Sequence, residues 1–216
     1  MNLEAIRARL AAYDPTLIAE PKVARASVAL VLRPSVDAVE LLLIQRATRD
    51  GDPWSGHMAF PGGRRDPGDA DAVHTAVRET HEEVGIDLAV DGAPLGKLDE
   101  LRAIARHRPL DLVISPIVFA LRGPVSMVLN AREVEGAIWV PLSFFTSADA
   151  RVTHRRTLDG IASDYPAFRY QERYTIWGLT HRILDGFLQL VDETPANRDC
   201  TPETAGCPPA GTTSAS

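Results

Sequence analysis

The chain has 216 residues, of which 45% are hydrophobic and 24% charged, a composition that suits one well-buried core. Its formal charge of -6 argues against a primary nucleic-acid binder, because such proteins need a basic face to neutralise phosphates. No apolar run of about 18 residues and no secretory signal pattern occurs, so we expect no membrane segment and a cytoplasmic location. Cys200 and Cys207 fit neither a disulfide framework nor a structural zinc site.

The first elements expected along the chain are a helix and two paired strands. Asn2 can cap a helix whose apolar residues recur at helical spacing. Residues 26–32 and 39–46 are rich in Val and Leu, and the stretch 34–37 between them suits a hairpin connection. We therefore expect a peripheral helix followed by an antiparallel strand pair.

The next part of the chain predicts a loop, a tight turn and a helix. A polar stretch at 48–56 precedes the short apolar step 58–60 and the Pro-Gly-Gly turn 61–63. A second loop leads into a helix expected over 71–84, for which Gly85 is the C-terminal stop. The glycine turn and the helix are therefore joined by a single loop.

The remaining chain predicts strands and one long helix. Strands are expected at 96–101, 112–121, 126–129 and 137–140. The second is nearly continuously apolar, which predicts a central position in a mixed sheet. Apolar residues at three- and four-residue intervals predict an amphipathic helix over 175–192. Trp139 and Trp177 lie in apolar segments and are expected in the core.

The C-terminal residues have a different composition from the rest. After Glu193 no aromatic residue occurs and Pro, Thr, Ala and Ser dominate, which cannot bury enough apolar area to offset the ordering entropy. We expect three segments: an N-terminal helix and linker at 1–22, one folded domain at 23–193, and a disordered tail at 194–216.

Three glutamates gather on one flank of the helix expected at 71–84. At about 100° per residue, Glu79 and Glu83 lie nearest the buried edge and Glu82 faces further out. Like charges this close destabilise a helix without a counter-charge, and oxygen donors suit Mg²⁺. The grouping favours a metal site, and the alternative is a solvated acidic surface held by an Arg78 to Glu82 pair.

The spacing between the turn and the helix separates these two interpretations. The run FPGG from Phe60, a spacer, and the run RETHEEVGI from Arg78 resemble the Nudix box, G-x5-E-x7-R-E-U-x-E-E-x-G-U with U apolar. The helix half departs only at Thr80, where an apolar residue is usual. In the loop half, the sixth residue after Gly63 is Asp69 instead of Glu, and the spacer is one residue longer. The role of Asp69 is left open.

The resemblance implies a fold class and a reaction. Nudix proteins have an α/β (α+β) fold, an α/β/α sandwich around a mixed β-sheet. They hydrolyse a nucleoside diphosphate linked to another group, using a bound divalent metal that neutralises charge and acidifies water. The expected cofactor is therefore Mg²⁺, with Mn²⁺ as the alternative.

The resemblance also implies roles for individual residues. The implied metal ligands are Glu79, Glu82, Glu83 and Gly63. Arg78 would orient the site, and Glu82 or Glu83 would serve as the catalytic base. Glu133 and Glu135, on the loop before the strand at 137–140, are alternative bases from outside the box.

Segments outside the box bear on the substrate. Residues 42–46 and 58–63, and further segments between about residues 26 and 190, resemble the coenzyme A pyrophosphatase branch, which also has the lengthened spacer. Residues 54–58 depart from it, because that branch usually has an Arg/His-containing stretch and Gly-Gln-Val there. Coenzyme A is the substrate hypothesis. The alternatives are a nucleoside diphosphate sugar hydrolase and a nucleotide-sensing domain without catalysis.

Three side chains near the turn are candidates for substrate binding, namely Arg46, His57 and Arg64. The basic runs 102–108 and 151–156 are more typical of solvated surface. The expected partner is a small-molecule nucleoside diphosphate derivative, with neither a membrane nor a stable nucleic-acid partner. The oligomeric state is left open, a homo-oligomer included.

Overall fold

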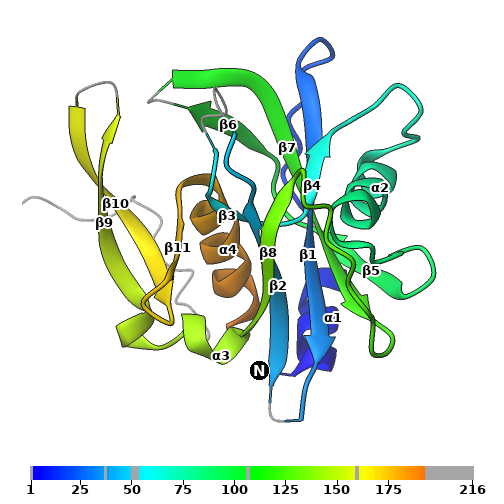
Figure 1. Ribbon diagram of the computed structural model, residues 1–216. Coiled ribbons are helices and arrows are strands. Elements are labelled where there is room, and N and C mark those ends of the chain that lie inside the picture. The colour runs from blue at the N-terminus through cyan, green and yellow to red at the C-terminus, as the bar shows by residue number, and fades with distance from the viewer. Residues whose placement is uncertain (1, 37, 50–53, 106–107, 159–160, 193–216) are drawn as a thin grey trace, which may run out of the picture.

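The computed structural model describes residues 2–36, 38–49, 54–105, 108–158 and 161–192. Within these residues the chain forms a large sheet of eight strands, a small sheet of three strands, and helices packed against them (Figure 1). The tail expected to be disordered, at 194–216, lies outside the described residues.

The elements follow one another in the order predicted over the first half of the chain. The helices are α1 Leu3–Ala11, α2 Ala72–Val84, α3 Leu142–Phe145, the 3₁₀ turn Ala148–Ala150 and α4 Gly178–Val191. The strands of the large sheet are β1 Ala24–Pro34, β2 Val39–Arg46, β3 Met58–Ala59, β4 Gly62–Arg64, β5 Gly92–Lys97, β6 Leu101–Ala105, β7 Arg108–Leu121 and β8 Val134–Pro141. The cap at Asn2 and the hairpin between β1 and β2 are confirmed.

The large sheet is mixed, as predicted. Strand β1 pairs in parallel with β7 and antiparallel with β2 and β4. Strand β7 pairs antiparallel with β5 and β6, and β2 pairs antiparallel with β3 and β8. The pairing of β4 with β1 sets Gly62 opposite Val28 and Gly63 opposite Ser27, which fixes the glycine turn against a central strand.

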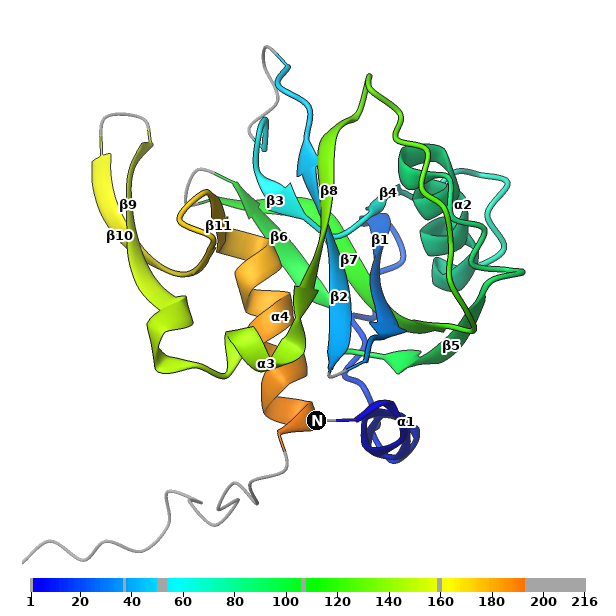
Figure 2. The ribbon, with the colours of Figure 1, turned by 60° about the horizontal axis from the view of Figure 1, so that its bottom comes forward.

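Helices cover both faces of this sheet, so the fold is the expected α/β/α sandwich. Successive side chains of a strand point to opposite faces. In β1, Leu30 and Leu32 belong to the core shared with α1 and α4, whereas Ala29 and Val31 belong to the core shared with α2. Figure 2 shows α2 on the side of the sheet away from α4.

The small sheet was not predicted. It consists of β9 Arg151–Leu158, β10 Ile161–Tyr170 and β11 Tyr174–Trp177, paired antiparallel in the order β11-β10-β9. The basic run 151–156 is therefore a strand, in which exposed and half-buried residues alternate. The sequence lacks an apolar alternation there because the half-buried positions include His154 and Arg156.

Two strand predictions were wrong. The strand expected at 96–101 is interrupted after Lys97, because residues 98–100 bind the N-terminal segment: the Thr16 N–H donates to Asp99 Oδ1 at 2.7 Å. The strand expected at 126–129 does not form. Instead the Val128 N–H donates to the Val84 carbonyl at 2.9 Å and so caps the C-terminal end of α2.

The last helix and one of the two tryptophans also differ from expectation. Residues 175–177 pair with β10 as part of β11, so α4 begins only at Gly178. Trp139 and Trp177 are half-buried: Trp139 packs against the core shared with α2, as expected, whereas Trp177 belongs to neither core. The Arg33 guanidinium lies 4.1 Å from the Trp139 ring centroid, a contact that an indole at the edge of the core can make with a cation.

Candidate active site

Helix α2 presents its three glutamates at different depths. It begins at the Asp71 cap and ends at Gly85, whose φ of 73° lies in the left-handed region, as the sequence predicted. Glu83 is 2% exposed. The side chain of Glu79 is 13% exposed and that of Glu82 is 51% exposed. The burial order derived from the helix geometry is therefore confirmed.

Glu83 joins the helix to the glycine turn. Its Oε2 accepts a hydrogen bond from the Gly62 backbone N–H at 2.9 Å. The pKa of Glu83 is raised to about 8, chiefly by burial, and the charges of Glu79 and Glu133 act in the same direction. The hydrogen bond from Gly62 and the charge of Arg46 act in the opposite direction. A carboxylate in this position needs additional positive charge to stay ionised at neutral pH.

Gly63 is required by the closeness of Glu79. A Cβ atom at Gly63 would lie 2.4 Å from Glu79 Cδ and 2.5 Å from each carboxylate oxygen. Any side chain at this position would therefore push the carboxylate away from the turn. Burial raises the pKa of Glu79, and the neighbouring Arg78 charge acts in the opposite direction.

Asp69, whose role the sequence left open, is the partner of Arg78. Arg78 Nε and Nη2 donate to the two carboxylate oxygens of Asp69 at 3.0 and 2.9 Å. The Asp66 N–H also donates to Asp69, which is 5% exposed. These bonds, the one from Arg78 foremost, hold the pKa of Asp69 well below its usual range. The lengthened loop thus supplies an acidic residue that fixes the guanidinium.

Arg78, held in this way, reaches the two outer glutamates. Its Nη1 lies 2.9 Å from Glu79 Oε1 and donates to Glu82 Oε2 at 3.0 Å, while Nη2 donates to the Arg64 carbonyl at 2.9 Å. The expected pairing of Arg78 with Glu82 is confirmed. Arg78 links α2 to β4, because Arg64 is the last residue of that strand.

Thr80 stands where the motif usually has an apolar residue, and the structure shows how it is accommodated. It is fully buried, and its hydroxyl donates to the Ala76 carbonyl one turn earlier at 2.7 Å. The buried hydroxyl is therefore satisfied within the helix, which limits the cost of placing it in the core.

The chain returns to α2 just before β8. The Asn130 N–H donates to the Glu83 carbonyl at 2.9 Å, and Asn130 Nδ2 donates to Glu133 Oε1 at 3.3 Å. The charge of Glu133 acts on Glu79 and Glu83, raising the pKa of both. Glu135 is exposed. Of the two carboxylates outside the box, Glu133 is thus the one placed with the helix glutamates.

The three candidates for substrate binding occupy different positions around the turn. Arg46 acts on Glu83 through its charge, and its N–H donates to the His57 carbonyl at 3.0 Å. The His57 ring meets the Trp177 ring edge-on, with centroids 4.8 Å apart. Arg64 is exposed. The structure therefore brings Arg46 to the glutamates, turns His57 toward Trp177 and leaves the Arg64 side chain at the rim.

The oxygen cage expected for a metal is not preformed. Among the described residues, no three His, Cys, Asp or Glu side chains converge as a metal site, because Glu79 and Glu82 reach Arg78 and Glu83 reaches Gly62. The donor set nevertheless fits a hard divalent cation. Burial raises the pKa of both Glu79 and Glu83, the charge of Glu79 adds to the rise at Glu83, and all three glutamates offer the oxygen ligands that such a cation prefers.

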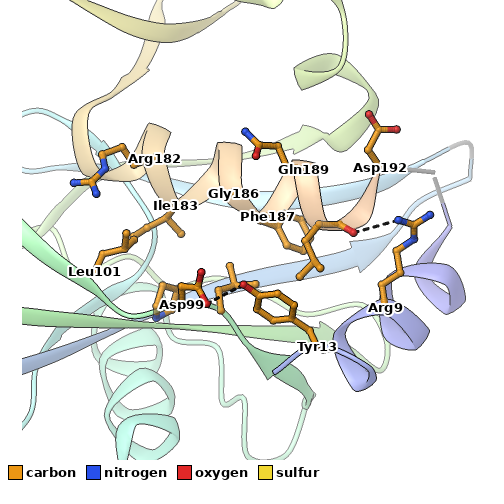
Figure 3. A pocket seen from close by; sticks show the side chains of 13 residues that line it. Arg9, Tyr13, Asp99, Leu101, Arg182, Ile183, Gly186, Phe187, Gln189 and Asp192 are labelled. Atoms are coloured by element: carbon orange, nitrogen blue, oxygen red, sulfur yellow. Dashed lines mark hydrogen bonds between the residues drawn. The ribbon is translucent and has the colours of Figure 1, made fainter. Parts of the chain in front are cut away.

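A cavity elsewhere in the molecule is separate from this chemistry. It has a volume of 580 Å³ and lies between α1 and α4 (Figure 3). Ile183 and Phe187 line it, and the Tyr13 hydroxyl donates to Asp99 Oδ1 there at 2.8 Å. Since α2 covers the opposite face of the sheet, the glutamates do not face this cavity.

A mixed sheet between helices, with clustered glutamates facing a glycine turn, defines a Nudix-type domain. Residues 23–160 match the NUDIX domain family, so the chain belongs to this family. Within the ranges that the structure describes, every helix is too short or too polar to cross a bilayer.

Several curated proteins are similar to the chain. A mitochondrial coenzyme A diphosphatase, NUDT8 of Homo sapiens, is 34% identical over 78% of this chain and 71% of that protein. A peroxisomal coenzyme A diphosphatase, ndx-8 of Caenorhabditis elegans, is 37% identical over 58% of this chain and 50% of that protein. An uncharacterised protein of Schizosaccharomyces pombe is 40% identical over 62% of this chain and 46% of that protein. The chain thus spans about half the length of these last two relatives.

Solved structures of related proteins are more distant. A MutT/nudix family protein from Enterococcus faecalis is 17% identical, with a TM-score of 0.48, over 89% of this chain and 70% of that chain. A Caenorhabditis elegans Ap4A hydrolase is 24% identical, with a TM-score of 0.47, over 56% of this chain and 82% of that chain.

Proposed function

We propose that the protein hydrolyses the phosphoanhydride bond of a nucleoside diphosphate linked to another group, with a divalent metal, and that coenzyme A is its substrate. One observation carries the proposal: the carboxylates of the buried Glu83 and the half-buried Glu79 are set against the glycine turn at Gly62 and Gly63. An acidic surface patch would leave these carboxylates in solvent, whereas Glu83 is 2% exposed and the Glu79 side chain is 13% exposed.

Each residue of the site has a role in this proposal. Glu79, Glu82 and Glu83 would hold the metal, with the Gly63 backbone beside it. A bound Mg²⁺ or Mn²⁺ would supply charge neutralisation for the diphosphate and acidify the attacking water. Arg78, fixed by Asp69, keeps Glu79 and Glu82 in place for this task.

The proton of the attacking water needs an acceptor. Glu82 and Glu83 are the candidates from the box, and Glu133 is the candidate from outside it that lies among the helix glutamates. Glu83 is 2% exposed, and the bond from the Gly62 N–H fixes its carboxylate at the glycine turn, as the positioning of a catalytic base requires. We therefore favour Glu83, and a comparison of the pH-rate profiles of Glu83→Gln and Glu133→Gln tests that choice.

Coenzyme A is favoured over other diphosphates by sequence similarity. Sequence segments outside the box resemble the coenzyme A branch, and two relatives at 34% and 37% identity are coenzyme A diphosphatases. Those relatives are described as mitochondrial and peroxisomal, so a cytoplasmic location for this protein stays a prediction.

A substrate panel tests the proposal. Purified protein with Mg²⁺ or Mn²⁺ is offered coenzyme A, ADP-ribose, NADH, dinucleoside polyphosphates and sugar nucleotides, and products are identified by mass. We expect coenzyme A to give the highest kcat/KM and two products that each end in a phosphate. A higher kcat/KM for a sugar nucleotide would contradict coenzyme A as the substrate. Tight nucleotide binding without turnover would contradict the proposed activity and would favour a nucleotide-sensing domain.

A further inference from the structure

The small sheet borders the strand that leads into the glycine turn. The Thr180 hydroxyl, in the first turn of α4, donates to the Met58 carbonyl of β3 at 3.0 Å. Trp177 of β11 meets the ring of His57, the residue before β3. In Figures 1 and 2, β3 lies between the small sheet on one side and β4 with α2 on the other. A substrate extending from the turn across β3 would therefore meet the small sheet.

Three residues of the small sheet, His154, Arg156 and Tyr165, gather around Trp177, and we call these four together with Arg169 the inner face. The rings of His154 and Tyr165 each lie 5.2 Å from the Trp177 ring, and the Arg156 guanidinium carbon lies 5.2 Å from the same ring. The register sets His154 opposite Tyr165, and Arg169 lies on the same face because residues two apart on a strand share a face.

The opposite face of this sheet neutralises its arginines. Arg155 Nε lies 3.9 Å from Asp164 Oδ1, and Arg151 Nη1 donates to Asp185 Oδ1 at 3.0 Å. These four side chains pair positive with negative charge, so they need no other partner. This face is an ordinary charged surface.

The inner face, in contrast, carries two arginines without a counter-charge. In the part of the chain that the structure describes, no carboxylate lies within 4.0 Å of the Arg156 or Arg169 guanidinium. Both side chains are half-buried. Burial lowers the pKa of the neighbouring His154, and the charges of Arg156 and Arg169 lower it further. Among the described residues, the inner face thus carries two positive charges with no carboxylate within ion-pair distance of either.

We propose that the inner face binds a phosphate monoester carried by the nucleotide substrate, separate from the diphosphate that is cleaved, with Arg156 and Arg169 as its ligands. The planar guanidinium fork matches phosphate geometry, and a dianion supplies the missing negative charge. Coenzyme A has such a phosphate on its ribose, whereas ADP-ribose and NADH do not. The inference rests on the proposed function and adds a specificity site to it.

The test compares coenzyme A with dephospho-coenzyme A, which lacks only the ribose phosphate. For each enzyme the measured quantity is the ratio of the two kcat/KM values. We expect the wild type to favour coenzyme A, and Arg156→Gln and Arg169→Gln each to lower the ratio by about 10-fold, as loss of one charge-assisted hydrogen bond predicts. Arg155→Gln, the adjacent arginine on the opposite face, is the matched control and should keep the wild-type ratio.

The outcomes separate this inference from the proposed function. If the wild type hydrolyses both compounds but Arg156→Gln and Arg169→Gln leave the ratio of the two kcat/KM values unchanged, the inner face does not bind the ribose phosphate. An equal loss on both compounds also contradicts the inference, because it shows a structural role. Partial recovery of the ratio in Arg156→Lys and Arg169→Lys would support a charged contact. If the wild type hydrolyses neither compound, it is the proposed function that fails.

Discussion

Replacing Gly63 by alanine should disable the site while leaving the fold intact. The new Cβ would lie 2.4 Å from Glu79 Cδ, whereas ordinary contact begins at 3.4 Å, so the carboxylate must move by about 1 Å. The φ angle of Gly63 lies outside the left-handed region, so the backbone accommodates alanine. Because a misplacement of this size costs about 100-fold in rate, we expect kcat/KM to fall by about 100-fold.

The assay pairs steady-state hydrolysis of coenzyme A with thermal unfolding. Gly68→Ala is the control, because it lies in the following loop and no atom is within 4 Å of the added Cβ. We expect Gly68→Ala to retain wild-type activity, and both variants to unfold within a few degrees of the wild type. The reasoning is refuted if Gly63→Ala keeps full activity, or if its loss of activity accompanies loss of the fold.

Two further predictions concern stability. Asp69→Asn should lower the free energy of unfolding by about 2 to 3 kcal/mol in urea titrations, because it removes the charge that holds Arg78, whereas the exposed Asp66→Asn should change little. The second prediction concerns pH. Because the pKa of Glu83 rises from 4.5 to about 8 on folding, the folded state binds more protons than the unfolded state between about pH 4.5 and pH 8. The free energy of unfolding of the metal-free protein should therefore fall as the pH rises through this range. Thermal melts in a chelator should show this decline relative to Glu83→Gln, and equal pH profiles for the two proteins would contradict it.

The features that the sequence predicted are those that local geometry determines. The 3.6-residue period of a helix places Glu79 and Glu83 nearer the sheet than Glu82, whatever surrounds them. The end of α2 at Gly85 likewise depends on one residue that adopts a left-handed conformation at low cost. For these positions, no knowledge of the tertiary structure was needed.

The features that were missed depend on contacts between distant parts of the chain. The bond between Asp69 and Arg78 depends on how the loop before α2 folds back toward the helix. A motif comparison does not give this path, because the spacer in this chain is one residue longer than in the motif. Its available signal was an acidic residue at the position where the motif has glutamate. Residues 126–129 have the composition of a strand but bind the end of α2, because the open carbonyl of Val84 is there.

The small sheet was missed for a different reason. His, Arg and Tyr side chains packed around Trp177 fill half-buried positions of this sheet, so strands β9 and β10 lack the apolar alternation that identifies a half-buried strand. A sheet face whose arginines lack a carboxylate partner and a solvated surface whose arginines are paired have the same composition. Only the pairing of charges in the folded protein distinguishes them.

The most direct test of the central claim is the hydrolysis of coenzyme A by wild-type protein and by Glu83→Gln, in Mg²⁺ and in Mn²⁺. Glu4→Gln, which changes an exposed carboxylate of α1 in the same way, is the control. If the buried carboxylates of α2 hold the metal, Glu83→Gln should lose about 1000-fold in kcat while remaining folded, and Glu4→Gln should match the wild type. Equal rates for all three proteins would contradict the assignment of this helix as the active site.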